Sequence, residues 1–110
     1  MPTTSPRGRR RTLDRNKKRL LCDAVSRGAR VVTGGKALER DGFYFPPTVV
    51  DRVPAESAIA REEIFGPVAA IRSFTTEEEA VALANDTDFG LIAYVYTGDL
   101  ARGLRVSEKI

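Results

Sequence analysis

The residues best suited to chemistry in this 110-residue chain lie in one stretch, Arg61-Glu62-Glu63-Ile64-Phe65-Gly66-Pro67-Val68. It sets two adjacent carboxylates and an aromatic ring before a Gly-Pro turn, and an apolar run follows at once. A carboxylate can accept hydrogen bonds from both hydroxyls of a diol, because it has two oxygens. The stretch therefore predicts one of two things. It is a binding site for a ligand with a diol and a flat ring, or it is a solvated turn in which Phe65 fills a core.

Several other kinds of chemistry are restricted by composition. The chain has no histidine and one cysteine, Cys22, which excludes a His-based triad and an internal disulfide and argues against a zinc site. Cys22 follows Leu21 in a helical pattern, and no activating base can be identified for it, so we interpret it as structural. The acidic run Glu77-Glu78-Glu79 is typical of the first turn of a helix, where the dipole favours negative charge. The sequence thus predicts neither a catalytic residue nor a metal site.

The secondary structure before this stretch can be predicted from the spacing of apolar residues and from the glycines and prolines that end helices and strands. Five apolar residues line one face of a helix that begins near Leu13 and that Gly28 stops: Leu13, Leu20, Leu21, Ala24 and Val25. Residues 29–33 then predict a short strand, ended by Gly34-Gly35. Residues 43–50 contain two prolines, which forbid a helix and confine this extended piece to a sheet edge or an ordered loop.

The elements after the stretch alternate strand, helix, strand, helix. Residues 68–74 predict a strand whose apolar start suggests burial on both faces. Thr75 is the expected N-cap of the next helix, with Glu78 at N3, an apolar stripe (Ala80, Val81, Leu83, Ala84), and an end at Asn85-Asp86. Residues 90–97 predict a further strand. Asp99 caps a last helix from Leu100, which carries Leu104 inward and still runs at Ile110. The pattern predicts an α/β fold class with a βαβα unit and parallel pairing.

Charge divides the chain unevenly. Residues 1–30 hold ten basic and two acidic side chains, a net +8, whereas residues 31–110 hold eight basic and thirteen acidic ones, a net −5. A basic arm can bind an anionic partner, or it can lie outside the fold. No aromatic residue interleaves the basic run, so base stacking with a nucleic acid has no support. We expect residues 1–12 to be a disordered basic leader and residues 13–110 to hold the fold.

Length and hydropathy place the chain among small globular proteins. It is long enough for one small domain, and 42% of its residues are hydrophobic. No apolar run approaches the roughly 20 residues that a membrane span needs, and no cleavable signal opens the chain. We therefore expect a cytoplasmic protein with no membrane partner.

Three ordered motifs resemble the aldehyde dehydrogenase superfamily. REEIFGPV resembles its Glu-Glu-x-Phe-Gly-Pro segment. Upstream, GARVVTGGKALERDGFYFPPTVVDRVP is similar to the stretch that leads to an aromatic-x-Pro-Thr-Val strand. Downstream, FTTEEEAVALANDTDFGLIAYVYTGDLARG is similar to the Asn-x-Thr-x-aromatic-Gly-Leu segment and the elements after it. The resemblance covers about residues 20–110, is greatest to the succinate-semialdehyde dehydrogenase branch, and departs from the family pattern at Ile92.

The resemblance implies a role for the opening residues. Family members oxidise an aldehyde to a carboxylic acid with NAD or NADP, using a cysteine nucleophile and a glutamate base, and the intact enzymes are homo-oligomers. By position, Glu63 matches the glutamate that accepts hydrogen bonds from the nicotinamide-ribose hydroxyls, and Phe65 matches the aromatic residue beside the nicotinamide. Glu62 is expected to face solvent or a neighbouring basic residue.

The resemblance does not extend to catalysis. The family's nucleophile, its base and its Gly-rich cofactor region all lie upstream of the matched motifs, and Cys22 falls where the family has no catalytic residue. We therefore expect a fragment of the catalytic domain that is inactive alone, with an incomplete cofactor pocket. The alternative is a small non-enzymatic interaction or regulatory module, whose basic N-terminus binds an anionic partner.

Overall fold

The computed structural model describes residues 6–36 and 44–110, with side chains from Arg15 onward. The chain divides into two compact units, Met1–Arg72 and Ser73–Ile110, and each is described by itself. The first unit holds α1 (Pro6–Ser26), β1 (Arg30–Thr33), β2 (Thr48–Asp51), α2 (Ala58–Arg61) and β3 (Val68–Ala70). The second holds α3 (Glu77–Asn85) and α4 (Leu100–Ser107). Helices and strands mix as predicted, and the fold class is α/β.

Helix α1 ends at the glycine that the sequence marks. Gly28 has φ +106°, its N–H donates to Val25 O, and Ala29 N–H donates to Ala24 O. These two bonds form a Schellman motif, in which a left-handed residue satisfies the last helical carbonyls. The start of the helix differs from the prediction. It begins at Pro6 rather than near Leu13, so residues 6–12, predicted to be disordered, are helical, while residues 1–5 lie outside the described residues.

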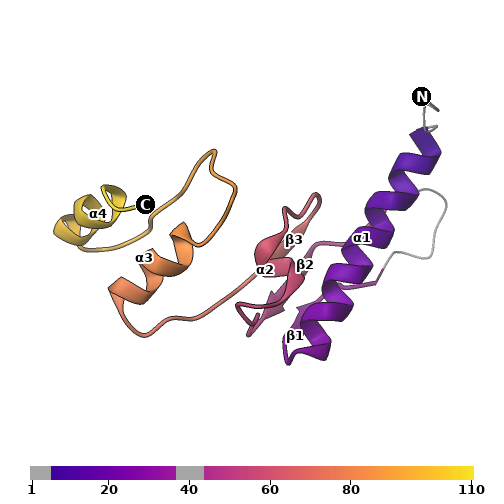
Figure 1. The fold of residues 1–110 in the computed structure, drawn as a ribbon, viewed down its shortest axis with the longest axis horizontal. Helices are drawn as coiled ribbons and strands as arrows, with labels where there is room; N and C mark the ends of the chain where they lie inside the picture. Colours follow the sequence, from indigo (N-terminus) through magenta and orange to yellow (C-terminus); the bar gives the residue numbers. More distant parts are fainter. Residues whose placement is uncertain (1–5, 37–43) are drawn as a thin grey trace. The chain divides into compact units, whose positions relative to one another are not determined.

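The sheet of the first unit has the order β1-β2-β3, and Figure 1 shows α1 running beside it. Strand β1 pairs antiparallel with β2, and β3 pairs parallel with β2, which places Thr48 opposite Val68. Of the two alternatives predicted for residues 43–50, a sheet edge or an ordered loop, the sheet edge is wrong, because β2 is the central strand. The prolines precede the strand in an ordered loop, so every residue of β2 keeps its N–H for pairing; Phe43 lies outside the described residues.

The core of this unit forms between α1, β2 and α2. Its buried apolar side chains are Leu20, Leu21, Ala24, Ala29, Val50, Val53 and Ile59. Leu20, Leu21 and Ala24 lie on one face of α1, as their spacing predicts. Strand β3 is shorter than predicted and is not buried on both faces, because Ala69 and Ala70 are exposed at the edge of the sheet.

The helices of the second unit begin with side-chain caps. Thr76 accepts a hydrogen bond from Glu79 N–H at 3.1 Å, and Asp99 accepts one from Arg102 N–H at 2.9 Å. Asp99 is the predicted cap, whereas the cap of α3 is shifted by one residue from Thr75. The side chain of Glu79 turns back toward the start of the helix, where its carboxylate accepts hydrogen bonds from the N–H and the hydroxyl of Thr75.

Three predictions for the second unit differ from the structure. Residues 90–97 form no strand, because a strand needs a partner for its backbone groups and these residues enter no ladder with another described segment. The predicted stripe of α3 and Leu104 of α4 are half-buried or exposed, since no further layer of this unit covers them among the described residues. Helix α4 ends at Ser107, where Glu108 N–H bonds Leu104 O, rather than continuing to Ile110.

No helix among the described residues is long and apolar enough to cross a membrane.

Candidate functional site

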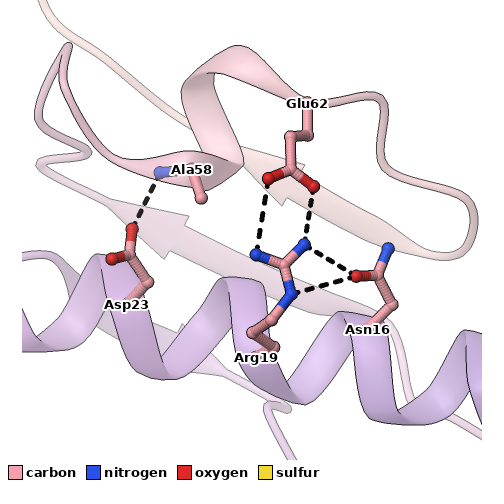
Figure 2. Close-up of polar contacts among 5 residues, drawn as sticks. All are labelled: Asn16, Arg19, Asp23, Ala58 and Glu62. Carbon is pink, nitrogen blue, oxygen red and sulfur yellow. Dashed lines mark hydrogen bonds and ion pairs between the residues drawn. The ribbon is translucent and has the colours of Figure 1, made fainter.

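The stretch that opened the sequence analysis is a loop of the first unit between α2 and β3. Its start is set by α2, a helix of four residues that the sequence analysis missed. Ser57 stands at the N-cap but makes no side-chain cap bond, since its hydroxyl donates to Pro54 O instead. The free N–H of Ala58 donates to the Asp23 carboxylate at 2.7 Å, so the cap comes from α1 (Figure 2).

Asp23 is held as a carboxylate by two contacts. The backbone N–H of Ala58 lowers its pKa most, and the Arg27 guanidinium, 3.1 Å away, lowers it further. A negative charge at this point also suits the N-terminal end of α2. No local pattern in the sequence indicates this role, because Asp23 and Ala58 are 35 residues apart.

Glu62 is bound to the same helix. Figure 2 shows the Arg19 guanidinium facing its carboxylate, with Nη2 2.6 Å from Oε2 and Nη1 3.4 Å from Oε1. The Oδ1 atom of Asn16 accepts from the same guanidinium, at 3.2 Å from Nε and 2.8 Å from Nη2. The pairing raises the pKa of Arg19. The expectation that Glu62 faces solvent or a basic residue is therefore confirmed in its second form.

The other end of the loop rests on α1 as well. Gly66 has φ +132°, a conformation that favours glycine, and a Cβ built there would clash with the side chain of Lys17. Lys17 Nζ also lies 5.2 Å from the centre of the Phe45 ring, in a cation–π contact. Between the two ends, Ile64 is half-buried and packs against the core.

The contacts of the loop alternate along the chain. Glu62, Ile64 and Gly66 face α1 or the core, whereas Glu63 and Phe65 are exposed, Phe65 at 64%. In an extended chain successive side chains point to opposite sides, so we infer from this alternation that Glu63 and Phe65 share the outer side. Phe65 does not fill the core, so the alternative of a solvated turn in which Phe65 is a core residue is wrong. An exposed carboxylate and an exposed ring are thus available to a ligand.

The rest of the described chain offers no candidate metal centre. Cys22 is exposed on α1, and no group of three or more His, Cys, Asp or Glu residues could hold a metal ion within residues 6–36 and 44–110.

The comparison with protein families decides the class. The model described as aldehyde dehydrogenase family matches residues 9–110. The chain belongs to the aldehyde dehydrogenase family. The match begins well before the region in which the sequence motifs were found, so it includes most of the basic run.

Individual aldehyde dehydrogenases agree with this assignment. The chain is 50% identical over 90 residues to the Escherichia coli succinate-semialdehyde dehydrogenase (NADP(+)), covering 82% of this chain and 19% of that protein. It is 46% identical over 90 residues to a Pseudomonas aeruginosa glutarate-semialdehyde dehydrogenase, with the same two coverages. The crystal structure of Staphylococcus aureus betaine aldehyde dehydrogenase in complex with NAD+ has a TM-score of 0.82 and 35% identity, over 90% of this chain and 20% of that one.

The chain thus spans about one fifth of the length of the curated relatives it matches. Family members use NAD or NADP, and the exposed residues of the loop fit such a group. Glu63 offers acceptor oxygens that no described side chain occupies, and Phe65 offers an open ring face. They supply only part of a binding site, since ligand pockets enclose most of a ligand's surface.

Proposed function

We propose that this chain supplies the nicotinamide-ribose loop of an NAD(P)-dependent aldehyde dehydrogenase that oxidises a small semialdehyde, such as succinate semialdehyde, in the cytoplasm. The main support for this proposal is that side chains of the loop alternate in their contacts. Glu63 and Phe65 are exposed, whereas their neighbours are held by α1 and the core. The semialdehyde substrate rests on the 50% identity to the Escherichia coli relative.

The cofactor supplies a hydride acceptor when bound; the residues of this chain bind and orient it. The Glu63 carboxylate accepts hydrogen bonds from the two ribose hydroxyls, and bonds to a charged acceptor are stronger than those to a neutral one. Phe65 packs beside the nicotinamide ring and limits its orientations. Neither residue touches a proton or electron pair of the reaction, so both act through binding geometry.

We further propose that the 110 residues alone do not oxidise aldehydes, and that residues 13–110 act as part of a larger catalytic domain. Cys22 is the one thiol in the sequence, and it lies exposed on α1 as a free cysteine. A steady-state assay with NAD+ or NADP+ and succinate semialdehyde should give no turnover above that of Cys22→Ala. Turnover that this substitution abolishes would overturn the structural role of Cys22.

The test of the loop needs a complete enzyme. We suggest a chimera in which residues 15–110 replace their counterpart in the Escherichia coli relative. Glu63→Gln keeps the size of the side chain but loses its charge, so it should raise KM for the cofactor by the equivalent of about 1–3 kcal/mol. Phe65→Ala should lower kcat more than it raises KM, because the ring no longer limits how the nicotinamide lies.

Glu56→Gln is the matched control, since Glu56 is an exposed acid of the same unit outside the loop. It should leave both constants unchanged. Equal effects of Glu56→Gln and Glu63→Gln, or none from either, would remove the ribose role from Glu63.

A further inference from the structure

We propose that Arg19 is a positioning residue of the cofactor loop, which selects Glu63 rather than Glu62 to face the ligand. The inference rests on the proposed ribose role of Glu63. Two identical side chains stand next to each other here, and only one can point outward at a time. A shift of an extended chain by one residue exchanges its two faces, so something must fix the register.

Arg19 has the geometry to fix it. Its two terminal nitrogens face the two carboxylate oxygens of Glu62, at 2.6 and 3.4 Å, and a planar guanidinium is suited to such a paired contact (Figure 2). Asn16, one turn earlier on α1, accepts from the Nε edge of the same group. A residue of the same helix therefore orients the guanidinium, independently of its contact with the loop.

The contribution of this pair is to geometry rather than to stability. The side chains of Arg19 and Glu62 are 53% and 45% exposed, and exposed ion pairs add little to the free energy of folding. The same contact nevertheless engages both carboxylate oxygens of Glu62. With Glu62 held on the side of α1, the next side chain along the extended loop points away from α1.

The first test uses the full 110-residue chain and measures backbone NMR order parameters of residues 62–65. Arg19→Met keeps the length of the side chain but removes the guanidinium, so we expect these values to fall from about 0.85 toward 0.6, while those of β2 stay unchanged. Arg15→Met is the matched control, because Arg15 is exposed one turn earlier on α1. The exchange Arg19→Glu with Glu62→Arg restores the opposite charges and should restore the order of the loop.

The second test uses the chimera and separates KM from kcat. Arg19→Met should raise KM for NAD+ or NADP+ by about two- to fivefold, the scale of an exposed ion pair, and change kcat less. The charge exchange should return KM toward its starting value. A merely structural role for Arg19 would instead lower the thermal stability of the chimera without a selective change in KM for the cofactor.

Each outcome bears on one proposal. If Arg19→Met leaves the order parameters unchanged, or if the charge exchange fails to restore KM, the positioning role is overturned. It is also overturned if the loop loses order and KM stays unchanged while Glu63→Gln raises KM, and the ribose role then stands. If Glu63→Gln has no effect, the ribose role itself fails, and the selection of Glu63 fails with it.

Discussion

The two units of the chain are stabilised in different ways. The first buries seven apolar side chains between α1, β2 and α2, including Leu20 and Val50 at 1% and 0% exposure. Among the described side chains of the second unit none is buried, and Leu91 and Tyr96 are 99% and 90% exposed. An open hollow of about 510 Å³ lies within that unit, lined in part by Ala80, Val81 and Val106. Burial thus organises one unit, whereas caps and ion pairs organise the other.

This difference matters for the candidate site. The loop that carries Glu63 and Phe65 belongs to the unit with the core; it contacts α1 through Glu62, and its Ile64 packs against the core. A binding residue works best on a support that does not move, because loose placement reduces the effect of each hydrogen bond. The buried core of the first unit is therefore part of what makes the loop a credible binding element.

The largest effect is expected when a leucine in a helix of each unit is truncated to alanine and the two losses of stability are compared. Leu20→Ala should destabilise the first unit by about 2–5 kcal/mol, because it removes a buried side chain and leaves a cavity. Leu104→Ala should change the second unit by less than about 0.5 kcal/mol, because Leu104 is 61% exposed. Residue-resolved hydrogen exchange in α1 and α4 would measure both. Equal losses would show that the second unit has a core of its own.

A smaller effect is expected at the junction of α1 and α2. Asp23→Ala removes the cap of α2 and the contact with Arg27, so the Ala58 amide should exchange with solvent roughly three- to tenfold faster. Asp23→Asn should do less, because its side-chain oxygen can still accept from Ala58 N–H. The amides of β2 are the internal reference.

The same contact predicts a dependence on pH. The folded-state pKa of Asp23 is lowered, so its contribution is complete above the unfolded value near 4 and is lost as the pH falls through the lower folded value. The protection of Ala58 should therefore persist through pH 5 and decrease in stronger acid. Loss of protection above pH 6 would contradict the assignment of Asp23 as the cap.

Local signals in the sequence predicted the elements that local interactions form. The Gly28 stop of α1, the Asp99 cap of α4 and the helix ending at Asn85-Asp86 all follow from neighbouring residues. Helix α2 was missed because its cap comes from Asp23, far away in the sequence. The strand predicted at residues 90–97 was not formed, because a strand depends on a partner that no local pattern supplies.

The site divides in the same way. The types and spacing of Glu63 and Phe65 singled them out, and both are exposed in the structure. Their support on α1 could not be predicted, since Arg19 and Glu62 are 43 residues apart and no spacing rule connects them. A helix face packed on a loop becomes visible only in three dimensions.

The smallest expected effect concerns the ion pairs that join α3 to α4. Glu77 receives two bonds from Arg105, both 2.7 Å long, and Arg102 lies 3.6 Å away. These contacts, Arg105 first, lower the pKa of Glu77. Because the pKa is lowered, the stability from this pair is present above the unfolded value of about 4.3 and is lost as the pH falls through the lower folded value. A titration followed by the carboxyl carbon shift should place the midpoint of Glu77 below that of an ordinary glutamate.

Arg105→Met should raise that midpoint toward the ordinary value and speed exchange of the α4 amides by about two- to fivefold, as for an exposed pair. Glu78→Gln is the control, because Glu78 is exposed in the same turn of α3. The comparison of the two units makes this effect informative although it is small. In a unit without buried side chains, a surface ion pair contributes a larger fraction of the free energy that holds the helices together than it does in a unit with a core. An unchanged midpoint in Arg105→Met would mean that α3 and α4 are joined by something other than Glu77, and the contrast between a core and an ion-paired unit would no longer hold.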